Sequence, residues 1–352
     1  MTVPAWRFDI SIEADLVEEV GRIYGYDKIP STLPTTASTQ GGLTEKQRFV
    51  RWTRQFMQGA GLSQAYSYAL TTPEKSHWFT VEERPSIRLD LPMSEERSEL
   101  RQSMLPSLLE ALQYNVARSQ QNVRLFEVGK VFSIGKNGSE DFQEREVIGS
   151  AVTGEWGHAS WQSPAQPVDF FALKGVLEAY FAELNCTDRI RFVATDAIGQ
   201  LHPGQTAYIY LGEELIGFIG KIHPVIQKEL DLSDTFVFEL LVEPLLAEGL
   251  KERVIQSVPK FPSMTRDIAL LVPVTMEHAT LESVIKENAG QYLQSVTLFD
   301  VYKGEHVQEG YQSLAYSIRF LNKEATLQEE EIKQAMDRIQ TALVALDDVT
   351  IR

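Results

Sequence analysis

The part of the sequence that most constrains the fold is the segment after Pro259 and Pro262. Its hydrophobic pattern switches between the two-residue repeat of strands and the repeat of about 3.6 residues that marks helices. The predicted order is strand 268–272, helix 279–289, strand 296–302, strand 314–321, helix 327–346 and a short strand at 349–351. This order predicts the ferredoxin-like split βαβ arrangement. Thr326 and Glu329 fit a capping box for the second helix.

In that arrangement the two helices cover one face of the sheet, and the other face is predicted to be open. Alternation along the third strand directs its apolar residues to the helices and its small or polar residues to the open face. The first set is Leu314, Tyr316, Ile318 and Phe320, and the second is Ser313, Ala315, Ser317 and Arg319. If this face meets RNA, its small residues leave room for unstacked bases, and Ala269 and Tyr302 could face a base there, with Ser313 supplying a hydroxyl. The alternative is a solvated sheet face with one ordinary surface tyrosine. The spacing alone favours this alternative.

Residues 43–250 contain helices separated by runs of strands. The first helix, at 44–58, has apolar residues at helical spacing, namely Phe49, Val50, Trp52, Phe56 and Met57. Further helices are predicted at 105–116 and 170–184, and strands at 123–133, 147–153, 207–211, 216–222 and 236–242. This succession is typical of an α+β layer rather than a doubly wound sheet. A helix at 44–58 that packs against a partner chain would present Trp52 and Phe56 on an exposed face.

The first 36 residues are too few to form a domain alone. We interpret Asp9–Tyr26 as the end of a strand followed by a helix, with a proline-bounded exit at Pro30 and Pro34. An abrupt start inside such a motif predicts a truncated chain whose upstream domains are missing. Residues 37–44 are small and polar and are predicted to form a linker.

Four carboxylates gather around the predicted N-terminal helix. Asp15, Glu18 and Glu19 are spaced i, i+3 and i+4, so they project from one side of the helix start. Asp9 lies in the segment that leads into the helix. Such carboxylates repel one another, and a hard divalent cation such as Mg²⁺ would relieve the repulsion. The alternative is a capping box, with Asp15 as the N-cap and Glu18 three residues later, and the spacing favours this simpler interpretation.

Composition limits the class of protein. The 352 residues, 43% of them apolar, are enough for two or three domains. The formal net charge of −16 argues against a broad basic face that coats nucleic acid, whereas a small local RNA contact is compatible with it. No run of about 18 apolar residues and no secretion signal appear, so we expect a cytoplasmic protein without a membrane span. The single cysteine, Cys186, excludes an internal disulfide and a CxxC-type zinc site.

Three stretches resemble one protein family, the β subunits of bacterial phenylalanyl-tRNA synthetases. WRFDISIEADLVEEVGRIYGYDKIP at 6–30 is similar to the end of the family's B5 domain. SELRQSMLPSLLEALQYNVARSQQNVRLFEVGKVF at 98–132 resembles its catalytic-like module. FPSMTRDIALLV at 261–272 and LFDVYKG at 298–304 resemble its ferredoxin-fold anticodon-binding domain. The stretches follow the order of the family, so the chain is identified as the C-terminal part of such a subunit.

The resemblance implies three domains: the end of B5 at 1–36, an inactive module at 43–250 and the anticodon-binding domain at 259–352. The implied fold is a class II synthetase-like antiparallel sheet with helices, followed by the ferredoxin-like domain. The implied partner is an α subunit, which binds ATP and attaches phenylalanine to tRNA(Phe), in an assembly with a second αβ pair. Family members carry Mg²⁺ ligands at positions matching Asp9, Asp15, Glu18 and Glu19, in a site shared with α.

The residues of the module favour a scaffold over a catalyst. Class II synthetases hold ATP with one arginine on the α-phosphate and another on the γ-phosphate. Arg124, in RLFEVGKVF, occupies a strand that resembles the first of these elements. IGFIGKIHP at 216–224, where the second element should come, has no arginine after its glycines. We therefore expect the chain to be inactive alone, to support α and to position tRNA(Phe).

Three other functions are compatible with the sequence. A stand-alone RNA-binding module would bind tRNA without a partner, which the acidity disfavours. An assembly fragment would pack the helix at 44–58 against a partner chain and have no role in aminoacylation. An independent class II-like enzyme would activate phenylalanine with ATP by itself, and we expect no such activity.

Overall fold

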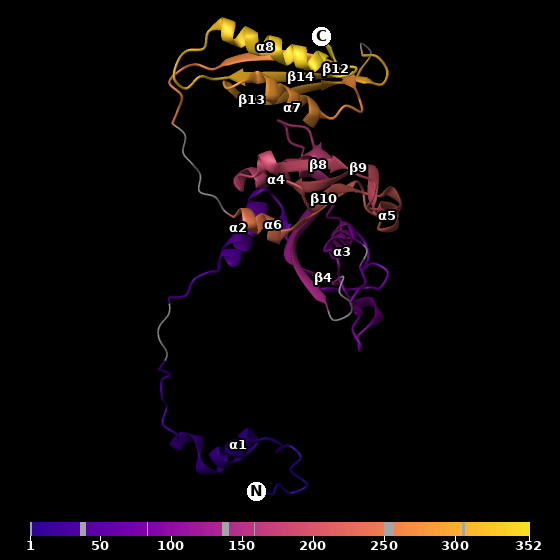
Figure 1. The fold of residues 1–352 in the computed structure, drawn as a ribbon. Coiled ribbons are helices and arrows are strands. Elements are labelled where there is room, and N and C mark those ends of the chain that lie inside the picture. The colour runs from indigo at the N-terminus through magenta and orange to yellow at the C-terminus, as the bar shows by residue number, and fades with distance from the viewer. Residues whose placement is uncertain are drawn as a thin grey trace. The chain divides into compact units, whose positions relative to one another are not determined.

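The computed structural model describes residues 2–35, 40–82, 84–135, 141–157, 159–249, 257–304 and 307–352 (Figure 1). Residues 36–39, which include part of the predicted linker, and residue 250 at the end of the predicted module lie outside this description. The chain divides into two compact units, Met1–Glu252 and Arg253–Arg352. Both contain helices and strands, which confirms the α+β class. None of the described helices is long and apolar enough to cross a membrane.

The N-terminal segment is built around helix α1, Glu13–Tyr24, followed by the 3₁₀ turn η1, Tyr26–Lys28. Turns replace the strand end that the sequence predicted before this helix. The amides of Arg7 and Ile10 donate to the carbonyls of the residues three positions earlier. A strand needs a neighbouring strand for its backbone groups, and the described residues pair none with this segment. The predicted strand end was therefore wrong.

A seven-stranded sheet forms the centre of the first unit. Its strands, in spatial order, are β1 (Ser63–Gln64), β4 (Val123–Ile134), β5 (Phe142–Thr153), β11 (Thr235–Leu241), β10 (Glu214–Ile222), β9 (Leu201–Leu211) and β8 (Ile190–Ala194). β1 runs parallel to β4, and the other neighbours in this sheet are antiparallel. The strands predicted between 123 and 242 all lie in it, so the expected antiparallel sheet is confirmed.

Helices pack on both faces of this sheet. α2 (Glu45–Gly59), α4 (Phe170–Glu183) and α6 (Val242–Glu248) share a core with Ile148, whereas α3 (Leu105–Val116) and α5 (Pro224–Glu229) share another with Val147. Because successive residues of a strand point to opposite faces, Val147 and Ile148 place the two cores on opposite sides. The smaller elements are β2 (Leu70–Thr71) with β3 (Glu99–Leu100), β6 (Glu155–Gly157) with β7 (Gln166–Pro167), and the turns η2 (Glu95–Arg97) and η3 (Thr187–Arg189).

The second unit is a four-stranded antiparallel sheet with two helices. Its strands, in spatial order, are β13 (Leu293–Tyr302), β14 (Tyr311–Phe320), β12 (Met264–Pro273) and β15 (Thr350–Ile351), and its helices are α7 (His278–Ala289) and α8 (Glu329–Val344). Leu281 of α7 and Ile339 of α8 are buried in one core with Leu270 and Tyr316 of the sheet. The order of elements along the chain confirms the ferredoxin-like arrangement.

Helix α8 begins two residues later than the sequence predicted. Gln328 is the N-cap, and its amide donates to Oε2 of Glu331 at 2.9 Å. Leu327, immediately before the N-cap, is buried in the core of the unit. The burial of this residue sets where the chain enters the helix, so the predicted capping box of Thr326 and Glu329 was wrong.

Helix α2 packs against α4 through a cluster of aromatic rings. Tyr180 stacks on Trp52 at 5.3 Å between ring centroids and meets Phe56 edge-on at 5.2 Å. The hydroxyls of Tyr180 and Thr53, both buried, are joined by a hydrogen bond of 2.8 Å. Burial raises the pKa of Tyr180 above its ordinary value, so this hydroxyl stays neutral. Trp52 and Phe56 are half-buried by these contacts, so the exposed aromatic face that would fit a helix packed against a partner chain is not present.

Removing one partner of this buried hydrogen bond should destabilise the first unit. Tyr180→Phe leaves the Thr53 hydroxyl buried without a partner, which costs about 1–3 kcal/mol. The double substitution Tyr180→Phe with Thr53→Val removes both polar groups, so it should recover most of that loss. Urea unfolding followed by tryptophan fluorescence measures both effects. A double variant that is no more stable than Tyr180→Phe would contradict the role of this pair.

Candidate functional site

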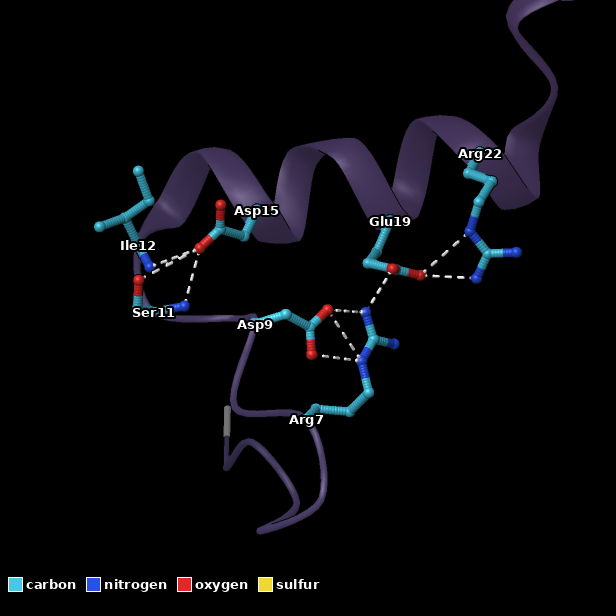
Figure 2. Close-up of polar contacts among 7 residues, drawn as sticks. All are labelled: Arg7, Asp9, Ser11, Ile12, Asp15, Glu19 and Arg22. Atoms are coloured by element: carbon cyan, nitrogen blue, oxygen red, sulfur yellow. Dashed lines mark hydrogen bonds and ion pairs between the residues drawn. The ribbon is translucent and has the colours of Figure 1, made fainter.

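The acidic residues around α1 do not converge on a single point (Figure 2). Asp9 and Glu19 both face the guanidinium of Arg7, at 2.8 Å and 2.5 Å. Arg22 pairs with the second carboxylate oxygen of Glu19 at 2.6 Å. Hydrogen bonds from Arg7 lower the pKa of Asp9 and, together with those from Arg22, the pKa of Glu19. A positive side chain therefore lies between these two carboxylates.

Asp15 is engaged at the start of the helix instead. Its Oδ2 accepts hydrogen bonds from the amides of Ser11 at 2.7 Å and Ile12 at 2.9 Å. The Ile12 amide is the larger cause of the lowered pKa of Asp15, followed by the Ser11 amide. Ile12 is the N-cap and Asp15 the third helical residue, so the prediction of Asp15 as the N-cap was wrong. Glu18 accepts from the Tyr26 hydroxyl at 3.2 Å.

This arrangement bears on the predicted Mg²⁺ ligands. In the described part of the chain, no three His, Cys, Asp or Glu side chains are grouped so that they could hold a metal ion. Arg7 neutralises Asp9 and Glu19, and backbone amides occupy Asp15. The four carboxylates, as arranged here, do not fit a Mg²⁺ ion. Binding would require Asp9 and Glu19 to release Arg7.

The open face of the second unit carries the three residues predicted to contact RNA. Tyr302 pairs with Ser313 across β13 and β14, and Ala269 pairs with Ala315 across β12 and β14. Ser313 and Ala315 are two residues apart on one strand, so their side chains share a face. The sheet therefore brings Tyr302, Ser313 and Ala269 to the same surface. The predicted alternation of β14 holds for its apolar residues, which are buried in the core.

The exposure of these three residues differs. Tyr302 is 40% exposed and Ala269 is half-buried, whereas Ser313 is only 8% exposed. Ser313 stands between Tyr302 and Leu271 in the register, and a small side chain between two large ones is shielded. A Cβ at Gly304 would lie 2.4 Å from the Tyr302 hydroxyl oxygen, so only glycine lets the ring lie over this turn. Tyr302 is the best placed of the three to stack on a base.

Two cations of the module, Arg124 and the lysine of the stretch 216–224, have internal partners. Arg124 of β4 donates to the Trp156 carbonyl at 2.6 Å, and its guanidinium carbon lies 5.4 Å from the centre of the Trp156 ring. Lys221, in the segment 216–224, pairs with Asp234 at 2.7 Å. Both charges are therefore satisfied within the module.

A buried polar network in the module escaped the sequence analysis. Arg101 pairs with Glu127 at 3.1 Å, and both side chains are almost completely buried. Glu239, also buried, accepts from the Ser103 hydroxyl and the Met104 amide. Arg101 and Glu127 both lie in the stretch 98–132 that carried the resemblance. Only their unusual position among apolar neighbours could have marked them, because their pairing joins the segment after β3 to β4.

Comparison with known families identifies three regions. Residues 1–26 match the tRNA synthetase B5 domain, residues 29–242 the CLM domain of the phenylalanyl tRNA synthetase beta chain, and residues 259–352 the ferredoxin-fold anticodon binding domain. Among solved structures, a pyrrolysyl tRNA synthetase from Desulfitobacterium hafniense covers 56% of this chain and 66% of its own, at 13% identity and a TM-score of 0.42. That likeness is too weak to carry an argument. The matched regions and the fold define a tRNA synthetase chain.

Curated relatives narrow this class further. The chain is 50% identical to the phenylalanine–tRNA ligase beta subunit of Bacillus subtilis over 97% of its own length and 42% of that protein. It is 47% identical to the Bacillus licheniformis subunit over 97% and 42%, and 43% identical to that of Latilactobacillus sakei over 100% and 44%. The chain thus spans less than half the length of these relatives. It belongs to the phenylalanyl-tRNA synthetase β-subunit family, as the resemblance predicted.

Proposed function

We propose that this chain supports the α subunit of phenylalanyl-tRNA synthetase and positions tRNA(Phe), while α binds ATP and attaches phenylalanine. The observation that carries the proposal is the family match in domain order along nearly the whole chain. The internal partners of Arg124 and Lys221 support an inactive module, because clamping ATP requires cations that are free to meet phosphate. The complete enzyme would be a cytoplasmic assembly of two αβ pairs.

In this proposal each of the three domains has its own role. Residues 1–36 end the B5 domain, residues 43–250 form the inactive module and residues 259–352 contact the anticodon. The alternative is a stand-alone RNA-binding or assembly module without a role in aminoacylation. Direct binding of tRNA by the chain without α would favour that alternative. The net charge of −16 disfavours such binding.

Co-purification with an α subunit tests the proposed role. We expect a complex whose mass corresponds to two copies of each chain. Phenylalanine-dependent ATP–pyrophosphate exchange should appear only when α is present, because this chain is proposed to lack the ATP clamp. Exchange by this chain alone, or a failure to associate with α, would contradict the proposal. Association without any effect on charging would favour the assembly module.

Contact with tRNA would have to be local, because the second unit is acidic. Residues 260–352 contain nine Lys or Arg and fourteen Asp or Glu, a difference of −5. Broad phosphate neutralisation is therefore a poor source of affinity. Stacking on an aromatic ring does not need net positive charge, and it contributes about 1–3 kcal/mol per base. Tyr302, half-exposed on the open face, supplies such a ring.

Replacement of this ring tests the RNA contact. In the complete enzyme, Tyr302→Ala should raise the KM for tRNA(Phe) by roughly 5- to 100-fold through lost stacking, with phenylalanine activation unchanged. Tyr302→Phe keeps the ring and should retain most of the affinity. Tyr114→Ala removes another exposed tyrosine, on α3, and serves as the matched control. An unchanged KM in Tyr302→Ala would rule out the assignment.

Binding of Mg²⁺ by Asp9, Asp15, Glu18 and Glu19 is proposed for the complete enzyme only, because the chain as described ties two of these carboxylates to Arg7. There, Asp15→Asn should weaken Mg²⁺ binding about tenfold or more by calorimetry. The amide oxygen still accepts from the amides of Ser11 and Ile12, so the helix start is kept.

Glu13→Gln, a change in the same helical turn outside the proposed ligands, is the control for this measurement. It should leave the Mg²⁺ affinity of the complete enzyme unchanged, because Glu13 is not one of the proposed ligands. Equal Mg²⁺ affinity in the Asp15→Asn enzyme and the unaltered enzyme would refute the proposed ligand set.

A further inference from the structure

A pocket of about 200 Å³ lies on the side of the seven-stranded sheet that packs against α3. Phe79, Val131, Val147 and Phe218 line it and belong to the core on that side. A cavity of about 150 Å³ accommodates benzene. The pocket therefore has room for one aromatic ring with a short substituent. Glu239 lines the same pocket and is only 9% exposed.

Only one of the two carboxylate oxygens of Glu239 is engaged. Oε2 accepts from the Ser103 hydroxyl at 2.9 Å and from the Met104 amide at 2.7 Å. No described residue donates a hydrogen bond to Oε1, and this oxygen is not sealed from solvent. The pocket thus presents an unused acceptor to whatever enters it.

The buried charges next to the pocket do not balance. Arg101 and Glu127 neutralise each other at 3.1 Å, with side chains 4% and 5% exposed. Glu239 adds a second negative charge, and no described cation pairs with it. Its burial raises its pKa to about 7, against the opposing effects of the Met104 amide, the Ser103 hydroxyl and the charge of Arg101. The carboxyl is therefore partly protonated at neutral pH, and when it ionises it has no described cation as a direct partner.

The remaining charged groups of the pocket do not supply that charge. Arg84 pairs with Glu82 at 2.7 Å and donates to Gln143. Arg145 is exposed and donates to the same Gln143 oxygen at 3.3 Å. His77 is also exposed. Neither arginine forms a described hydrogen bond or ion pair with Glu239, so its carboxylate has no described cation as a direct partner.

We propose that this pocket binds a small primary ammonium compound with an aromatic or similarly bulky apolar body. The ammonium group would donate to Oε1 of Glu239 and balance the buried negative charge. The apolar body would lie against Phe79 and Phe218. The proposed role in aminoacylation does not require such a ligand. The two proposals can therefore be tested independently of each other.

Phenethylamine is a suitable probe for calorimetric titration of the whole chain at about pH 8, where Glu239 is largely ionised. We expect saturable binding at one site. Glu239→Gln keeps an acceptor for Ser103 and Met104 but turns an amide N–H towards the ammonium group. Affinity should therefore fall by about tenfold or more. Glu144→Gln, the same change at an exposed residue paired with Lys130, should leave it unchanged.

Three further measurements separate charge from shape. 2-Phenylethanol, which has the same body without the charge, should bind about tenfold or more weakly than phenethylamine. Leu215→Trp should abolish binding by filling the pocket while it leaves Glu239 in place. Lowering the pH to about 6 protonates Glu239 and should weaken binding. Glu239→Gln should lose that pH dependence.

The proposal is overturned by either of two results. One is the absence of saturable phenethylamine binding to the folded, unaltered chain. The other is equal affinity in the unaltered chain and in folded Glu239→Gln. If Glu239→Gln does not fold, tight binding by folded Leu215→Trp overturns it as well, because the ligand would then occupy another site.

Discussion

The pairing of β5 with β11 is the contact on which the first unit depends. It joins two segments that are far apart in sequence, with Val147 opposite Leu241 and Thr153 opposite Thr235. Through it the β4–β5 pair and the strands β8 to β11 become one sheet with a core on each face. It also sets Glu239 opposite Gly149, where a Cβ would come within 3.0 Å of Met104. The position of Glu239 beside Met104, and with it the pocket, therefore depends on this pairing.

The same sheet shows two ways to bury a carboxylate. Glu127 is satisfied on both sides, by Arg101 at 3.1 Å and by the Ser67 hydroxyl at 2.6 Å. Arg101 in turn donates to Ser67 and to the Lys130 carbonyl. Such complete hydrogen bonding offsets the desolvation of the two ions. Glu239 has donors on one oxygen only, and this difference distinguishes a structural ion pair from an acceptor available to a ligand.

Internal pairing of cations recurs through this acidic chain. Arg7 and Arg22 form ion pairs with Glu19, and Arg266 forms one with Glu329 at 2.5 Å. Arg124 donates a hydrogen bond to a backbone carbonyl. These cations already have partners within the chain, so binding phosphate would require them to leave those partners. The proposed RNA contact relies instead on a sheet face of small residues with one aromatic ring, which suits an acidic surface because stacking is less sensitive to net charge than phosphate contacts are.

Local periodicity and family motifs in the sequence determined the longer helices, the larger strands, the ferredoxin-like order and the family, whereas the short helices α5 and α6 were not predicted. These features could be read from one chain because repeats of two and about 3.6 residues record which face of an element is buried. The same two-residue alternation predicted that Tyr302 of β13 and Ser313 of β14 share a face, and their pairing in the register agrees.

Only the tertiary structure decided which side chains meet. α4 covers Trp52 and Phe56, burial of Leu327 shifts the start of α8, and Arg7 occupies the carboxylates of Asp9 and Glu19. The meeting of Arg101, Glu127 and Glu239 likewise depends on strand pairing. Each of these outcomes is a contact between groups separated along the chain. Their energies depend on burial and on the available partners, and local sequence patterns record neither.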